Sequence, residues 1–278
     1  MTKAAGYRSN FSTLADVYAK YRTSYGVDLF DTIASYARPT AVVPTFMVGN
    51  VGPTFMVGHE NINLRALDLG CGTGLSAAGL IERGFAVTGI DIAEEMLEQA
   101  RQSVKGDSAF YEGRAEALPF ADAAFGLVTC AQAFHWFDFD QSFAEIARVL
   151  RPGGAVALFW KHSSHDDPYE ACAVELMREI SGRDEPFNLS RAQTKQFDAF
   201  WAERAAFRDH EEWRLPLSLR FTVDSFVGYH SSREDARFHL GERRAEFLSR
   251  LRNKVAELAH GDEFTVDAMQ YLYLARKR

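Results

Sequence analysis

The sequence has few cysteines, no excess of positive charge and no long apolar run. Three cysteines are an odd number without metal-ligand spacing, which argues against a disulfide scaffold and favours a reducing compartment. Lysine and arginine total 31 against 38 acidic residues, and this negative balance argues against a general nucleic-acid binder. No segment approaches the length of a membrane span, and no leader peptide is visible. We therefore expect a cytoplasmic protein without a membrane or nucleic-acid partner.

The most informative stretch that the sequence does have is a glycine-rich turn. Gly70, Gly72 and Gly74 lie between a short buried strand predicted over 64–69 and a helix predicted over 75–83. Glycines permit positive φ values and let the backbone approach a ligand closely. The free N–H groups at the start of the helix favour a polar or anionic ligand group. The turn therefore predicts a ligand site; the alternative is a tight turn that binds nothing.

An acid follows at the tip of the next predicted strand. Residues 85–90 form an apolar run that ends in Asp91, about 20 residues after the first glycine, where a ribose hydroxyl pair is commonly bound. Asp91 therefore predicts a βαβ nucleoside site. The identity of the nucleoside depends on finer detail, because a nicotinamide dinucleotide would use such an acid equally well.

The spacing of the glycines and the acid before them decide between these nucleosides. A dinucleotide fingerprint reads G-x-G-x-x-G, whereas here the third glycine comes one residue earlier and Asp68 precedes the turn. This pattern resembles motif I of the class I S-adenosylmethionine (SAM) methyltransferases. The resemblance implies that the turn wraps the methionine part of SAM and that Asp68 helps to hold its ammonium group, usually through water. An acid suits a cationic ligand and opposes a pyrophosphate.

Two further motifs resemble the methyltransferases called type 11. Residues 113–120, G-R-A-E-A-L-P-F, resemble a family run in which Ala115 and Glu116 lie along the adenine edge. Arg114 stands where many relatives carry aspartate, which leaves the bond to the adenine amine to the backbone. Residues 148–154, R-V-L-R-P-G-G, resemble the start of the family's fifth strand, where a turn reverses the chain. Taken together, the motifs imply cofactor contacts from one set of residues: Asp68, Gly70, Cys71, Gly72, Gly74, Asp91, Ile92, Met96, Ala115, Glu116 and Gln132.

A histidine follows the fourth predicted strand. Residues 131–137, A-Q-A-F-H-W-F, resemble the signature of a type 11 subgroup related to trans-aconitate methyltransferases. Ligands bind outside the carboxyl ends of parallel strands, so Gln132, His135 and Trp136 are expected to face the sulfonium and the acceptor. His135 is the candidate catalytic residue, a base for a phenol or enol, and its alternative is a structural histidine. A carboxylate acceptor needs no base.

The N-terminal segment is predicted to be helical over 10–37 with an aromatic face. Residues 18–25, Y-A-K-Y-R-T-S-Y, resemble a lid segment of type 11 proteins, and core packing is the alternative. Arg22 and Lys161 are candidates to pair with an acidic substrate. His162 and His165 favour a polar loop at the pocket mouth over a metal site, and no metal is predicted. The candidate substrate-binding residues are Tyr18, Tyr21, Arg22, Tyr25, Trp136 and Lys161.

A repeated hexapeptide interrupts the chain before the first strand of the predicted core. Residues 44–49, P-T-F-M-V-G, recur unchanged at 53–58 around an Asn/Gly linker, which predicts a hairpin-like insert. Its apolar edge character favours covering a surface or pairing with a second chain, so a homodimer through 44–58 is one prediction. A mobile tandem duplication without function is the alternative, and neither prediction gives the insert a catalytic role.

The chain as a whole is predicted to be one α/β domain, since 278 residues with 47% hydrophobic content suffice for one large core. The resemblance implies a doubly wound, Rossmann-like sheet of seven strands, mostly parallel with an antiparallel last strand, and helical lid insertions. It also implies SAM-dependent methyl transfer to a small molecule, with S-adenosylhomocysteine as product and O-methylation of a carboxylic acid or phenol favoured. The alternatives are a catalytically silent SAM-binding protein and an NAD-dependent oxidoreductase. The predicted parts are lid helices over 1–37, the insert over 38–63, the core over 64–162, helical lids over 163–206 and 223–260, and closing strands over 207–222 and 261–278.

Overall fold

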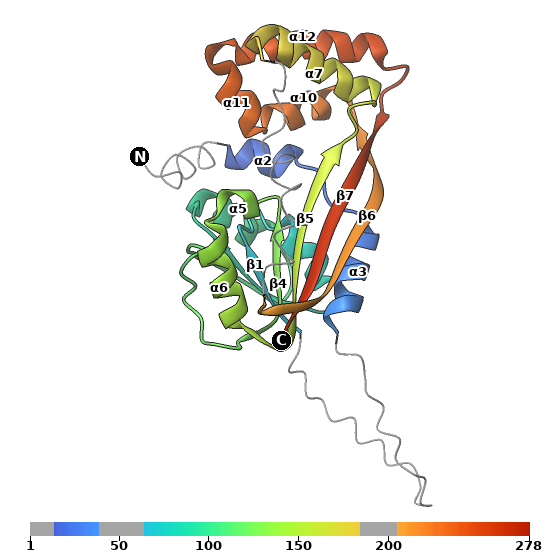
Figure 1. Ribbon diagram of the computed structural model, residues 1–278. Coiled ribbons are helices and arrows are strands. Elements are labelled where there is room, and N and C mark those ends of the chain that lie inside the picture. The colour runs from blue at the N-terminus through green and yellow to red at the C-terminus, as the bar shows by residue number, and fades with distance from the viewer. Residues whose placement is uncertain (1–13, 39–63, 184–204) are drawn as a thin grey trace, which may run out of the picture.

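The computed structural model describes residues 14–38, 64–183 and 205–278 (Figure 1). These residues form a seven-stranded sheet in the order β3-β2-β1-β4-β5-β7-β6, with helices on both of its faces. The predicted fold class is confirmed. The repeated hexapeptide, the homodimer proposed for it and residues 184–204 of the helical lid predicted over 163–206 lie outside the described residues.

The first five strands are parallel, as the alternation of short apolar runs and helical patterns predicts. Helices α3 (Val27–Ala37), α4 and α5 cover one face of the sheet and bury their apolar sides in one shared cluster, whereas α6 covers the other face and buries its apolar side in a second cluster. The elements are β1 (Arg65–Leu69), α4 (Leu75–Ile81), β2 (Ala86–Asp91), α5 (Glu94–Ser103), β3 (Ser108–Glu112), β4 (Phe125–Ala131), the 3₁₀ turn η1 (Phe134–Trp136), α6 (Phe139–Val149) and β5 (Leu150–Ser163).

Two irregularities interrupt the pairing of the strands. The Pro-Gly-Gly turn is a bulge within β5, because the pairing with β4 jumps from Phe125↔Leu150 to Leu127↔Ala155. β6 (Phe207–Phe221) pairs with β7 (Phe264–Lys277), and the register of this pair shifts between Arg208 and Glu211. β7 lies between β5 and β6 and is antiparallel to both.

The described N-terminal residues, 14–38, form two helices, and the two have different surroundings. α3 (Val27–Ala37) packs on the sheet and contributes to the main core, so it is not a lid. α2 (Ala15–Tyr21) lies between α5 and the helices above the sheet (Figure 1). The break between them is held by a tertiary contact, since the amide of Gly26 donates to Oε1 of Gln270 at 2.8 Å.

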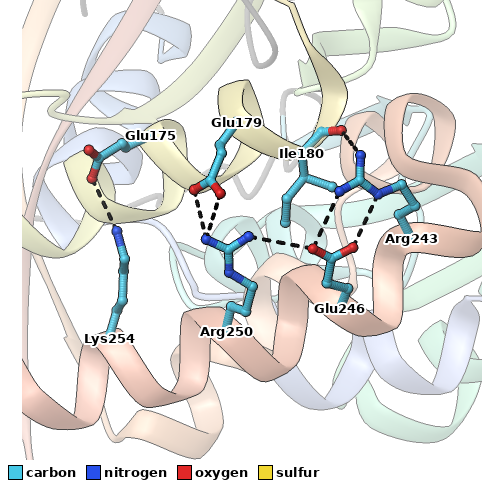
Figure 2. Close-up of polar contacts among 7 residues, drawn as sticks. All are labelled: Glu175, Glu179, Ile180, Arg243, Glu246, Arg250 and Lys254. Carbon is cyan, nitrogen blue, oxygen red and sulfur yellow. Dashed lines mark hydrogen bonds and ion pairs between the residues drawn. The ribbon is translucent and has the colours of Figure 1, made fainter.

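Four helices form a module beyond the carboxyl ends of the parallel strands (Figure 1). We call α7 (Pro168–Ser181), α10 (Val223–Ser231), α11 (Glu234–Leu240) and α12 (Arg244–Leu258) the helical module. It has its own apolar cluster, which includes the fully buried Phe226 and Phe247. Its outer side carries ion pairs between α7 and α12, such as Arg250 with Glu179 at 2.7 Å and Lys254 with Glu175 at 3.3 Å (Figure 2).

Candidate functional site

The glycine turn joins β1 to α4 and has one open position. Gly70, Gly72 and Gly74 all have positive φ values, of +63°, +53° and +82°. A Cβ on Gly70 would lie 2.6 Å from that of Ala133, and one on Gly74 would lie 2.4 Å from Val104, so both glycines are required by the protein's own packing. A Cβ on Gly72 would meet no described atom within 4 Å. Gly72 is therefore where the backbone is open to a ligand.

Asp91 fastens this turn to the tip of β2. Its Oδ2 accepts a hydrogen bond from the amide of Gly72 at 2.9 Å, and its Oδ1 accepts one from Ala93 at 3.0 Å. The side chain is buried, and this burial raises the pKa of the carboxyl group despite the opposing backbone amides of Ala93, Gly72 and Ile92. Each oxygen retains acceptor capacity beyond its amide bond, which is what a ribose hydroxyl pair requires.

Asp68 lies deeper than the sequence pattern suggests. It is fully buried and its oxygens accept hydrogen bonds from the hydroxyls of Ser76 and Thr129, the latter at 2.8 Å. Burial raises the pKa of its carboxyl group to about 6, with a smaller increase from Asp91, while the two hydroxyls oppose the shift. Asp68 thus anchors β1 to α4 and β4. Ser76 and Thr129 are neighbours that the motif alone did not identify.

The two acids make this edge of the sheet electronegative. No positively charged side chain of the described residues contributes to the shifted pKa of Asp68 or Asp91. Cys71, between them in the fold, is buried, and burial followed by the two carboxylates raises the pKa of its thiol well above the usual value. A positively charged ligand would relieve this electrostatic imbalance.

The residues predicted around the adenine divide into buried and half-buried positions. Met96 is buried under α2 with Ala93 and Tyr18, whereas Ile92 is half-buried. Ala115 is buried on the opposite face of the sheet, in the cluster that includes α6. The carboxylate of Glu116 accepts a hydrogen bond from the amide of Asp138 at 3.0 Å, so it fastens its loop to the start of α6.

A second set of contacts that holds this loop on α6 was not predicted. Glu145 on α6 accepts a hydrogen bond from the amide of Leu118 at 2.6 Å, and Arg148 donates to the carbonyls of Leu118 and Phe120. Glu145 and Arg148 also form an ion pair at 2.8 Å. Their i, i+3 spacing on a predicted helix could have indicated the pair, but not the loop that it holds.

Gln132 and His135 follow β4 at the same edge. Gln132 has a φ of +57°, unusual for a residue with a side chain, and is fixed there by bonds from its amide to the carbonyl of Phe159 and from its Nε2 to that of Lys161. His135 is half-buried, beside the ring of Trp136 at a centroid distance of 4.9 Å. Its Nδ1 accepts a hydrogen bond from Nε1 of Trp160 at 3.2 Å, and burial lowers the pKa of the imidazole to about 4.

Lys161 is committed to a structural contact with the N-terminal segment. Its buried ammonium donates to the carbonyls of Thr23 and Ser24 and to the Thr23 hydroxyl, at 2.6 to 2.8 Å. These bonds use its three donors. Burial, and then the charge of Arg22, lowers the pKa of Lys161 to about 7.

Arg22 lies where α2 meets the helical module. Its guanidinium stacks over the rings of Tyr18 and Tyr229, at 4.6 and 5.4 Å, and its Nη2 donates to the carbonyl of Ser232 at 3.3 Å. Its Nε is buried without a hydrogen-bond partner. No salt bridge to a carboxylate of the described residues offsets its charge.

The three predicted lid tyrosines have different roles. The ring of Tyr21 packs against Gly228 of α10, where a Cβ would lie 2.4 Å from it. Tyr18 contacts Met96 and Arg22 between the two regions. Tyr25 packs edge-on against Phe30 and Phe159, so its ring belongs to the core. No cluster of metal-ligating side chains occurs among the described residues, His162 and His165 included.

The comparisons with known proteins agree with this geometry. Residues 67–158 match the family described as the methyltransferase domain. This segment, about a third of the chain, is similar to methyltransferase domains. An uncharacterized methyltransferase of Mycobacterium tuberculosis is 41% identical over 120 residues, 43% of this chain and 47% of that protein. The demethylmenaquinone methyltransferase of Deinococcus radiodurans is 43% identical over 100 residues, 34% of this chain and 42% of that protein.

The similarity in sequence covers part of the chain, while the similarity in fold covers most of it. This chain spans about half the length of the curated relatives that it matches. A solved structure from Anaeromyxobacter dehalogenans, proposed to be a type II methyltransferase, aligns over 93% of this chain and 98% of its own, with a TM-score of 0.66 and 22% identity. The helices outside residues 67–158 therefore belong to a fold seen elsewhere. The trans-aconitate subgroup stays a prediction. In the described part of the chain, no helix is both long enough and apolar enough to cross a membrane.

Proposed function

We propose that this protein transfers a methyl group from SAM to a small-molecule acceptor and releases S-adenosylhomocysteine. The observation that carries the proposal is the pair of buried carboxylates, Asp68 and Asp91, on either side of a backbone position that is open at Gly72. SAM carries a sulfonium and an ammonium group, and both suit an electronegative edge. The pyrophosphate of a nicotinamide dinucleotide would instead be repelled there.

The chain's own residues would hold and orient the donor. Asp91 would accept hydrogen bonds from the ribose hydroxyls, Gly72 would permit close approach, and Asp68 would supply negative charge from beneath the turn. SAM supplies an activated methyl group, so the reaction needs approach and a dry site more than an acid or a base. Alignment of the two reactants alone can lower a barrier by about 7–11 kcal/mol.

We further propose that the acceptor carries an anionic group, a carboxylic acid or phenol that is methylated on oxygen. Support comes from Arg22, a charge without a carboxylate partner among the described residues and with a buried, unbonded Nε. A carboxylate would complete its hydrogen bonds as well as its charge. Lys161 contributes positive charge nearby, but its hydrogen bonds are already taken by the N-terminal segment.

A methyl-transfer assay tests this proposal. The protein is incubated with SAM carrying a labelled methyl group and with a panel of carboxylic acids, phenols and amines. We expect label in esters or ethers, formed together with an equal amount of S-adenosylhomocysteine. Binding of SAM without transfer to any acceptor would favour the silent binding protein, and binding of NAD in place of SAM would contradict the proposal.

A further inference from the structure

The hydrogen bond between Trp160 and His135 fixes the tautomer of the imidazole. Trp160 lies on β5, is fully buried and points its Nε1–H at Nδ1 of His135 at 3.2 Å. An indole nitrogen can only donate a hydrogen bond, so Nδ1 must present its lone pair. In the neutral ring the single proton is then on Nε2.

The second ring nitrogen is the one left open. The bond from Trp160 is the one hydrogen bond of the imidazole within the described residues, and His135 as a whole is half-buried. η1 places this ring directly after β4, at the edge of the sheet where Gln132 and the glycine turn also lie. Nε2–H is therefore available as a hydrogen-bond donor on the side of the sheet where a methyl-accepting substrate would bind.

We propose that His135 is a fixed hydrogen-bond donor rather than a base, that Trp160 is its positioning residue, and that the acceptor is therefore a carboxylate rather than a phenol. This inference rests on the proposed methyl transfer and narrows it. A phenol must lose a proton to react well, but Nε2 already holds one and the lone pair of Nδ1 is engaged by Trp160. A carboxylate arrives without a proton to lose.

The reaction with a carboxylate balances without a proton transfer. One carboxylate oxygen forms a bond to the methyl carbon while the bond from that carbon to sulfur breaks, and the electron pair of the broken bond stays on sulfur. The products are a neutral methyl ester and a neutral thioether. The other carboxylate oxygen can accept the Nε2–H bond throughout, which orients the attacking oxygen.

The electrostatics of the ring support this role. Burial alone lowers the pKa of His135 to about 4, and no charged side chain contributes to the shift. The imidazole is therefore neutral over the whole physiological range, and its tautomer stays fixed there.

Nitrogen NMR of the free protein tests the tautomer without any need for activity. In ¹⁵N-histidine-labelled protein, with the signal assigned by its loss in His135→Gln, we expect an unprotonated Nδ1, a protonated Nε2 and a titration midpoint near pH 4. Trp160→Phe removes the donor and should populate both tautomers, whereas Trp213→Phe, an exposed tryptophan on β6, should change nothing. A proton on Nδ1 in the wild type would overturn the inference, even if SAM is bound and methyl transfer is observed.

Kinetics with defined acceptors test the substrate class. For a carboxylate, His135→Ala should lower kcat/KM about tenfold or more without changing the shape of its pH profile between about pH 6 and pH 8, where Asp68 and Lys161 titrate. In His135→Gln the side-chain amide can donate a hydrogen bond from a similar place, so this variant should retain most of the wild-type kcat/KM. The inference would be overturned if kcat/KM for phenol methylation rises through about pH 6.5 in the wild type and this rise is absent in His135→Ala. If Trp160→Phe fails to fold, the wild-type tautomer and the Ala/Gln comparison still decide it.

Discussion

The cofactor end of the site and its acceptor end are built over different distances in the sequence. At the cofactor end, Asp91 bonds to Gly72, 19 residues away, within one βαβ unit. At the acceptor end, Lys161 bonds to Thr23 across 138 residues, and Arg22 bonds to Ser232 across 210. A local motif can be kept as a unit while the distant contacts change. The difference shows why the cofactor class is easier to assign here than the acceptor.

The largest effect is expected at the cofactor end. Asp91→Ala removes the acceptor of two backbone bonds and of the proposed ribose bonds, so SAM affinity should fall more than about hundredfold, since a hydrogen bond to a charged group contributes about 1.5–3 kcal/mol. Isothermal titration calorimetry measures the change. Asp224→Ala, an exposed acid of the helical module paired with Arg252, is the matched control and should bind normally. Equal affinity in both variants would remove Asp91 from the site.

A pH-dependent change in stability is expected for Asp68→Asn. The folded-state pKa of Asp68 is raised from 3.8 to about 6, so its contribution to stability is present below about pH 4 and lost as the pH rises through 6. The free energy of unfolding of the variant should therefore increase relative to that of the wild type as the pH rises from 4 to 7. The increase should reach up to about 3 kcal/mol, at about 1.4 kcal/mol per pKa unit. Urea unfolding at a series of pH values measures the difference in free energy. A difference that stays constant, or that falls with pH, would be evidence against a buried, protonatable Asp68.

A smaller and more selective effect is expected at the acceptor end. Arg22→Gln removes the charge between Tyr18 and Tyr229, so KM for an acidic acceptor should rise about tenfold, as loss of one charged hydrogen bond implies, while SAM affinity stays unchanged. Arg22→Lys keeps the charge and should have an intermediate KM. Steady-state kinetics and a titration with SAM separate the two ends. Loss of SAM binding in Arg22→Gln would show that the ends are not separable.

The smallest effect is expected on the outer side of the helical module. Arg250→Ala removes the ion pairs with Glu179 and Glu246 seen in Figure 2, which are partly exposed, so stability should fall by only about 0.2–1 kcal/mol. Phe247→Ala on the same helix removes a fully buried ring and should lower stability by about 3–5 kcal/mol. Chemical unfolding measures the loss of stability in both variants. A loss for Arg250→Ala as large as that for Phe247→Ala would mean that the ion pairs hold the module.

The sequence was sufficient where structure follows from local pattern. The strands on either side of the glycine turn, the positive φ values of its glycines and the position of Asp91 at a strand tip all follow from short-range chemistry. The antiparallel last strand followed from the resemblance and is confirmed.

The sequence was insufficient where a side chain's partner is far away. Trp160 reads as one more apolar residue of a buried strand, and only the fold places its N–H on His135. Lys161 reads as a free cation, but the fold engages it with Thr23 and Ser24. The helical region predicted over 10–37 is interrupted before α3, where Gln270 of the last strand bonds to Gly26. Each of these partners lies far away in the sequence, so the local pattern does not indicate it.

Binding of SAM to the unmodified protein tests the central claim most directly. Calorimetric titration of the full chain with SAM, S-adenosylhomocysteine and NAD at neutral pH compares a cationic nucleoside with its neutral product and with a pyrophosphate. The electronegative edge formed by Asp68 and Asp91 predicts saturable binding of the first two and none of NAD. Saturable binding of NAD to folded protein that does not bind SAM would contradict the account.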